Sequence, residues 1–295
     1  MTATGHTVRL LILPPRDSEA MAQMRRRELD IPRSLAAKLG SSAVKAARNG
    51  YYFTRAQNKV DWRDLVHNAC SAKLSIPPDA ELPVPEPRPR HRTIVQVTNE
   101  TTLQVAHRLN ARGSSLLVLN FANGVQPGGG FLHGALAQEE VLCRSSALYS
   151  TLADDEMYEC HRSRPQPDST DWAILSPDVP VFRADNGTEL DTPWLASFLT
   201  CAAPYTPAIG QPASGNLLQR RIHRVLAIAE AYGYAALVLG AWGCGAFGND
   251  PHRTAADFRL ALENEFSGVF SDVIFAITDW SREKRYIGPF LTVFS

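Results

Sequence analysis

Apolar and polar residues alternate along the chain in a pattern that predicts a protein of the α/β class. Continuous apolar runs, typical of strands buried on both faces, lie at residues 116–121, 235–241 and 273–278. Further strands are predicted at 93–97, 172–175, 179–183 and 195–202. Helices are predicted over residues 101–112, 139–152, 217–232 and 251–266. Because strands and helices alternate, we expect helices on both faces of a mostly parallel or mixed sheet.

The first third of the chain has a different organisation. Residues 34–48 predict a helix that ends at Asn49-Gly50, and residues 51–54 and 59–62 predict a hairpin. A short helix is expected over residues 64–74. Residues 1–30 are polar and are expected to be irregular, with the three arginines from Arg25 forming a solvated face.

A proline-rich segment separates this part from the rest of the chain. Residues 77–92 contain six prolines among charged residues. Proline lacks a backbone N–H and fixes φ, so the segment cannot form a helix or a central strand. We predict an extended strap or linker there. Residues 1–92 are then an N-terminal extension packed on a core of residues 93–295.

The chain carries equal numbers of basic and acidic residues, so its overall charge does not attract nucleic acid or membranes. Thirty basic and thirty acidic residues give a formal net charge of +0, so a polyanionic ligand requires a local site. The five cysteines are odd in number and form no CxxC pair, which favours a reducing compartment and argues against structural zinc. We expect a cytoplasmic monomer with no metal, no cofactor, no membrane span and no sequence-specific binding to nucleic acid.

Two glycine-rich loops carry the candidate chemistry, and each follows a predicted buried strand. The first spans residues 120–130 and ends in Gly128-Gly129-Gly130; the second spans residues 240–251 and leads into a helix. Glycine amides can approach an anion without interference from Cβ, and a helix N-terminus favours negative charge. The loops therefore suit a diphosphate, with tight packing as the alternative explanation for the glycines. Neither loop is a Walker A motif.

The first loop is followed, after a spacer of seven residues, by Gln138-Glu139-Glu140. Three glycines, a short spacer and Gln-Glu-Glu resemble the signature of poly(ADP-ribose) glycohydrolases, a family within the macrodomain superfamily. The second loop, Gly243-Cys244-Gly245-Ala246-Phe247-Gly248-Asn249, is similar to the bacterial-type branch. The resemblance extends from about Arg33 to the C-terminus. It implies a macrodomain-like three-layer α/β/α fold with a mixed central sheet and an N-terminal helical and hairpin extension.

The resemblance also implies an activity and a set of site residues. The activity is hydrolysis of the ribose–ribose bonds of poly(ADP-ribose) with release of ADP-ribose, and thus reversal of ADP-ribosylation in the DNA damage response. It implies that Glu140 is the general acid and base, that Glu139 binds ribose hydroxyls and that Gln138 braces the loop. The other residues implied to bind substrate are Asn123, Gly128, Gly129, Gly130, Gly243, Gly245, Ala246, Phe247 and Gly248.

Adjacent glutamates cannot flank a glycosidic bond from opposite sides as the two carboxyls of ordinary glycosidases do. We therefore expect Glu140 to act twice, first as an acid toward the leaving group and then as a base toward water. Without the glycines, Glu139 and Glu140 would be explained by the preference of carboxylates for a first helical turn.

The adenine site is less well defined by the sequence. Thr98, Asn99 and Glu100 follow a strand and offer polar groups to a base, and helix capping explains them equally well. Tyr205, Phe198 and Phe290 are candidates for stacking on the base or for the core.

Two other functions share the same loops. One is a reader that binds ADP-ribose without cleaving it. The other is a hydrolase that removes mono-ADP-ribose from protein or nucleic acid. If the chain cleaves the polymer, its likeness to the bacterial-type branch implies cleavage from chain ends (exo).

Overall fold

The computed structural model describes residues 10–295; predictions that concern residues 1–9 lie outside the described part. An eight-stranded sheet with the order β1-β5-β10-β9-β6-β8-β7-β4 forms the centre of the fold. Its strands are β1 (Leu11–Ile12), β4 (Leu74–Ile76), β5 (Ile94–Thr98), β6 (Leu116–Ala122), β7 (Ala173–Arg183), β8 (Glu189–Ala202), β9 (Ala236–Leu239) and β10 (Asp272–Ala276). In this order, all neighbouring strands from β1 through β8 pair in parallel. The last two pairs, β8 with β7 and β7 with β4, are antiparallel. The predicted mixed sheet is confirmed.

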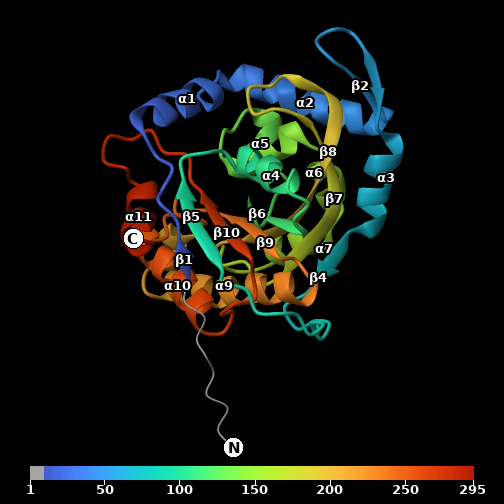
Figure 1. Ribbon diagram of the computed structural model, residues 1–295. Coiled ribbons are helices and arrows are strands. Elements are labelled where there is room, and N and C mark those ends of the chain that lie inside the picture. Colours follow the sequence, from blue (N-terminus) through green and yellow to red (C-terminus); the bar gives the residue numbers. More distant parts are fainter. Residues whose placement is uncertain (1–9) are drawn as a thin grey trace, which may run out of the picture.

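Helices cover both faces of this sheet, which confirms the three-layer prediction (Figure 1). One face carries α9 (Ala213–Ala231), α10 (Pro251–Glu263) and α11 (Ile287–Val293). The other carries α2 (Arg33–Asn49), α3 (Arg63–Ala72), α4 (Thr102–Asn110), α5 (Gln138–Ser145), α6 (Leu148–Leu152) and α7 (Glu156–Arg162). The remaining elements are α1 (Glu19–Leu29), the hairpin strands β2 (Tyr51–Phe53) and β3 (Lys59–Asp61), the 3-10 helix η1 (Phe131–His133) and α8 (Thr206–Ile209).

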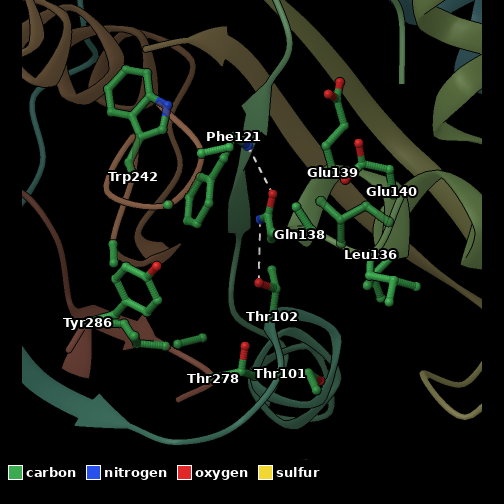
Figure 2. A pocket seen from close by; sticks show the side chains of 18 of the residues that line it. Thr101, Thr102, Phe121, Leu136, Gln138, Glu139, Glu140, Trp242, Thr278 and Tyr286 are labelled. Atoms are coloured by element: carbon green, nitrogen blue, oxygen red, sulfur yellow. Dashed lines mark hydrogen bonds between the residues drawn. The ribbon is translucent and has the colours of Figure 1, made fainter. Parts of the chain in front are cut away.

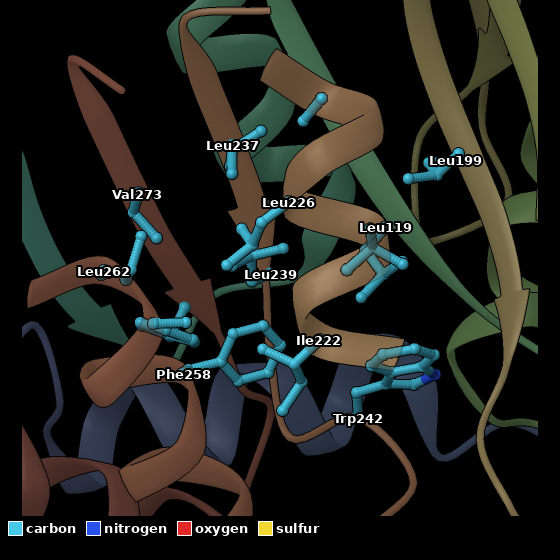
Figure 3. Close-up of a cluster of buried hydrophobic side chains, with 14 of the residues drawn as sticks. Leu119, Leu199, Ile222, Leu226, Leu237, Leu239, Trp242, Phe258, Leu262 and Val273 are labelled. Carbon is cyan, nitrogen blue, oxygen red and sulfur yellow. The ribbon is translucent and has the colours of Figure 1, made fainter. Parts of the chain in front are cut away.

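The sheet separates two hydrophobic cores. Along β6, Leu117 and Leu119 belong to the core under α9 and α10, whereas Leu116 and Val118 belong to the core under α4 and α5. This follows from the two-residue period of a strand. Because both faces are covered, the strand is apolar at nearly every position. Figure 3 shows Leu119 packed with side chains of α9 and its neighbours.

The N-terminal third supplies both edge strands of the sheet. β1 pairs with β5 at Leu11↔Ile94, and β4 pairs with β7 at Leu74↔Leu175. The expectation that residues 1–30 are irregular is wrong for the described residues 10–30, which contain β1 and α1. Of the three arginines predicted on a solvated face, Arg26 and Arg27 are exposed, whereas only 4% of Arg25 is exposed. Both errors arise because the partners of this segment lie far along the chain.

The proline-rich segment forms neither helix nor strand, as predicted. It runs over the core and is fastened to the loops that precede β9 and β10. Arg88 donates a hydrogen bond to the carbonyl of Gly233, and the His91 amide donates one to the carbonyl of Gly268 at 2.7 Å. The segment is therefore a strap, and the division of the chain at residue 92 stays a prediction.

Three predicted elements, one helix and two strands, differ from the structure in their continuity. The predicted helix 139–152 is broken at Ser146, whose extended backbone (φ −142°) bridges Val181 of β7 before α6 begins. The two predicted strands at 172–175 and 179–183 are one strand with a bulge between Ser176 and Val179. Asp178 at the bulge has a φ of 49°, which explains the local change of register. Within residues 10–295, every helix is too short or too polar to span a bilayer.

Candidate active site

The two glycine-rich loops meet at one edge of the sheet. β6 and β9 are parallel neighbours with Leu116 paired to Ala236, so their carboxyl ends lie side by side. The loops that follow these strands border a cavity of about 390 Å³. This position is where open α/β sheets bind ligands, and the volume falls in the usual range for small-molecule sites.

The structure brings most of the predicted site residues to this cavity. Its wall includes Asn123, Gln138, Glu139, Glu140, Gly243, Gly245, Ala246 and Phe247. Gly128, Gly129, Gly130 and Gly248 belong to the same two loops but are not among the residues that line the cavity. The sequence-predicted set is thus one spatial cluster.

Gln138 attaches the start of α5 to the end of β6. Its Oε1 accepts a hydrogen bond from the Phe121 amide at 2.9 Å (Figure 2), and its Nε2 donates to the Leu119 carbonyl at 2.8 Å. Nε2 also lies 3.4 Å from the hydroxyl of Thr102. Both ends of the amide are therefore engaged by protein, and the side chain fixes where the following glutamates begin.

Glu139 is held inside the first loop. Its Oε2 accepts a 2.7 Å hydrogen bond from the Asn123 amide, and its Oε1 lies 3.3 Å from Nδ2 of Asn120. Only 3% of the residue is exposed. Burial raises the pKa of this carboxyl to about 8, and the nearby charge of Glu140 acts in the same direction. Glu139 thus keeps its proton at neutral pH.

Glu140 also lies against the glycine run, with more freedom for its second oxygen. Its Oε1 accepts a 2.9 Å hydrogen bond from the Gly130 amide. Its Oε2 has no hydrogen-bond partner among residues 10–295, and the residue lines the cavity. One carboxylate oxygen is therefore anchored and the other is available to a ligand.

Gly129 lets the two glutamates approach the first loop. Its φ is +57°, and a Cβ at this position would lie 2.4 Å from Oε1 of Glu140 and 3.0 Å from Oε2 of Glu139. A side chain would be strained in this backbone conformation and would collide with both carboxyls. The glycine is required by the geometry of the acidic pair.

The second loop is fixed by hydrogen bonds of Asn249 and faces free space at Gly245. Asn249 is buried, donates to the carbonyls of Pro204 and Gly243, and accepts from the hydroxyl of Ser214 at 2.7 Å. By contrast, a Cβ on Gly245 would meet no atom within 4 Å. The backbone of Gly245 therefore faces free space at the cavity, as a loop that receives an anion requires.

Comparison with known proteins identifies the family. The sequence matches the profile described as "Microbial-type PARG, catalytic domain" over residues 41–184. The crystal structure of the poly(ADP-ribose) glycohydrolase from Thermomonospora curvata is 37% identical in sequence with a TM-score of 0.83, and the match covers 88% of this chain and 99% of that one. The chain belongs to the microbial-type poly(ADP-ribose) glycohydrolase family.

Two related structures contain ligands. The Thermomonospora curvata enzyme bound to the inhibitor ADP-HPD is 36% identical with a TM-score of 0.81, covering 88% of this chain and 99% of that one. The Deinococcus radiodurans enzyme in complex with ADP-ribose is 34% identical with a TM-score of 0.70, covering 77% and 96%. No curated protein of known function matches the sequence. Family membership makes the chain a poly(ADP-ribose) glycohydrolase, as its two loops predicted.

Several residues of the glycohydrolase cavity were missed by the sequence analysis. Thr278 and Tyr286 follow the last strand and lie across the cavity from Gln138 (Figure 2). Trp280, which is 41% exposed, also lines it. These three residues follow β10, whose carboxyl end reaches the same sheet edge, so the end-of-strand rule could have found them. Leu29 of α1 also lines the cavity, but it does not follow a strand, so this rule could not have found it.

The residues considered for adenine are largely occupied by the protein itself. Thr98 donates to Glu100 at 2.7 Å, Glu100 pairs with Arg108 at 3.0 Å, and Asn99 bonds to the backbone of Asp279. Thr101, rather than Thr98 or Asn99, caps α4 in a capping box. Phe198 and Phe290 are fully buried core residues, and Tyr205 is exposed beside Phe247, with 5.8 Å between the two ring centroids.

Neither a metal cluster nor a reactive thiol is built into the described site. Residues 10–295 contain no group of three or more His, Cys, Asp or Glu that could hold a metal. Burial raises the pKa of Cys244 to about 12, so the thiol stays protonated in the second loop. The carboxyl groups that line the cavity are those of the two glutamates of α5 and of Asp185.

Proposed function

We propose that Glu140 donates a proton to the leaving ribose oxygen and then accepts one from the attacking water. The observation that supports this role is the difference between its two oxygens. Oε1 is fixed by the Gly130 amide at 2.9 Å, and Oε2 has no hydrogen-bond partner among the described residues of the cavity. A positioned carboxyl with one free oxygen is what proton transfer to a bound sugar requires.

Glu139 is less suited to that role. Both of its oxygens accept hydrogen bonds from the first loop, and it is more deeply buried than Glu140. With its pKa raised to about 8, it carries no charge at neutral pH. Glu139 therefore leaves the pair with at most one negative charge, on Glu140, and offers hydrogen bonds to ribose hydroxyls.

The reaction proceeds in two steps with balanced protons. Protonated Glu140 gives its proton to the oxygen of the departing ribose as the bond from that oxygen to the anomeric carbon breaks. The carboxylate of Glu140 then takes a proton from water, whose oxygen bonds to the anomeric carbon. The products are ADP-ribose and a polymer shortened by one unit, and Glu140 is protonated again.

The two loops position the substrate for these steps. Backbone amides around Gly245 and Ala246 receive the diphosphate, and Asn123 and the glycine run line the distal ribose. Asn123 is itself fixed, since its Oδ1 accepts hydrogen bonds from the amides of Val125 and Gln126, each at 2.9 Å. A side chain that is fixed in this way contributes to catalysis because it needs no reorganisation during the reaction.

The substrate class follows from this arrangement and from the family. We assign poly(ADP-ribose), cleaved from chain ends, as the substrate, within ADP-ribosylation reversal after DNA damage in the cytoplasm. The test is a digest of labelled polymer of defined length with product sizes followed over time. Early free ADP-ribose with slowly shortening chains is expected. Early oligomers would contradict exo cleavage, and release of no ADP-ribose would indicate a reader.

A further inference from the structure

Arg144 lies one helical turn after Glu140 on α5 and is buried to an unusual degree for an arginine. Only 1% of it is exposed, and neither Nη1 nor Nη2 has a hydrogen-bond partner among residues 10–295. Positions i and i+4 share a helix face, which places the guanidinium on the side of Glu140. A buried guanidinium without hydrogen bonds is costly, so opposite charges must offset it.

The charges that offset Arg144 belong to the active site and its wall. Asp185 and Glu140 stabilise the charged guanidinium, whereas Arg183 opposes it. Asp185 lines the cavity and is 6% exposed; its Oδ2 accepts from the Thr101 hydroxyl at 2.7 Å, and its Oδ1 is unpartnered among the described residues. Asp185 is thus the second anion beside Arg144.

The series of charges continues into the N-terminal helix α1. Arg25 and Arg144 both stabilise the charge of Asp185, and Arg25 pairs with Glu28 at 2.9 Å. Glu140 interacts with Arg144, Arg144 with Asp185, Asp185 with Arg25, and Arg25 with Glu28, so the charges alternate in sign along this series. The arrangement connects α5, the turn after β7 and α1.

We propose that Arg144 and Asp185 are positioning residues that set, with opposite sign, the proton affinity of Glu140. Arg144 favours the carboxylate and Asp185 favours the protonated acid. The inference rests on the proposed role of Glu140. The other titratable groups that face the pair are Glu139, Cys143 and Tyr158. Burial raises the pKa of all three, so they are uncharged at neutral pH.

The test compares the pH dependence of kcat/KM in two variants, one of which removes a positive charge and the other a negative charge. The basic limb, which is the fall of kcat/KM at high pH, reports the ionisation of the acid that must be protonated to donate its proton to the leaving group. Arg144→Met should move this limb to higher pH by about one unit, and Asp185→Asn should move it to lower pH by about half a unit. Arg144→Lys keeps the charge and should restore the wild-type limb. The affinity for ADP-ribose should change by less than about threefold in Arg144→Met and Arg144→Lys, because Arg144 does not line the cavity.

A purely structural role gives a different result. It would lower activity at all pH values together with the melting temperature and would leave the limb in place. Shifts of Arg144→Met and Asp185→Asn in the same direction would also overturn the inference. If Arg144→Met does not fold, Arg144→Lys and Asp185→Asn still decide it, because only Asp185→Asn should move the limb. Glu140→Gln is the separate control: full hydrolysis by that variant would refute the proposed function itself.

Discussion

The amide of Gly130 donates a 2.9 Å hydrogen bond to Oε1 of Glu140, ten residues along the chain. The glycine run of the first loop and the first turn of α5 are therefore one structural unit. This explains why three glycines and two glutamates occur at a fixed spacing. The glycines bring backbone amides to the carboxyls, and the carboxyls in turn fix the loop that borders the substrate.

Gly129→Ala is expected to abolish hydrolysis. The added methyl would require a strained φ of +57° and would lie 2.4 Å from Oε1 of Glu140. The matched control is Gly113→Ala, because Gly113 has a φ of +74° and no atom within 4 Å of the added methyl. The control should lose about 1 kcal/mol of stability and keep its activity. Equal kcat/KM in the two variants would show that the contact with Glu140 is unimportant.

The raised pKa of Glu139 gives a prediction about stability against pH. The folded state holds this proton to about pH 8, and the unfolded chain releases it near the ordinary value for glutamate. Between these values the folded state binds more protons, so the contribution of Glu139 to the free energy of unfolding falls as pH rises. Glu139→Gln should remove a pH dependence on the order of a few kcal/mol.

The measurement is chemical unfolding of both proteins at pH 5 and pH 8. The wild type should lose more stability between these pH values than Glu139→Gln does. Parallel changes in the two proteins would mean that Glu139 is ionised at neutral pH and that it shares the negative charge of the pair with Glu140.

Local patterns predicted the layers of the fold and the two loops, because these depend on short-range periodicity. The buried runs of β6 and β9 and the amphipathic α9 are examples. The break at Ser146 could not be predicted, since it depends on a bridge to Val181, which is distant in sequence. The place of α1 beside the cavity also depends on long-range contacts, including Arg25 with Gln104 of α4.

The candidate site shows the same division. Glu139, Glu140 and the glycines of the first loop were predicted because they form a motif of fixed spacing in the family that the chain resembles. Asp185 was missed because it is isolated in the sequence and lies at the cavity through long-range packing, which includes its 2.7 Å hydrogen bond from Thr101. Buried charges that interact with residues far along the chain leave no pattern in the sequence around them.

Asn249→Ala is predicted to weaken both the second loop and ADP-ribose binding. The change removes the hydrogen bonds to Pro204, Gly243 and Ser214 and leaves buried partners unsatisfied, at a cost of about 2 kcal/mol. ADP-ribose affinity should fall several-fold because the open backbone at Gly245 loses its support. Calorimetric titration with ADP-ribose measures this effect.

Asn264→Ala provides the comparison for that experiment. Asn264 is exposed and donates one hydrogen bond to the Leu260 carbonyl at 2.8 Å, at the end of α10. Its replacement should change stability by less than about 0.5 kcal/mol and leave ADP-ribose binding unchanged. Similar losses of affinity in the two variants would argue against a role of Asn249 in shaping the site.

The proposed role of Glu140 is tested most directly by single-turnover hydrolysis of poly(ADP-ribose) by Glu140→Gln, measured beside its affinity for ADP-ribose. The amide keeps an oxygen for the Gly130 amide and cannot give or take the proton. We predict that ADP-ribose release falls by at least about a thousandfold while the affinity stays near that of the wild type. Hydrolysis at the wild-type rate by a variant that binds ADP-ribose normally would contradict the account.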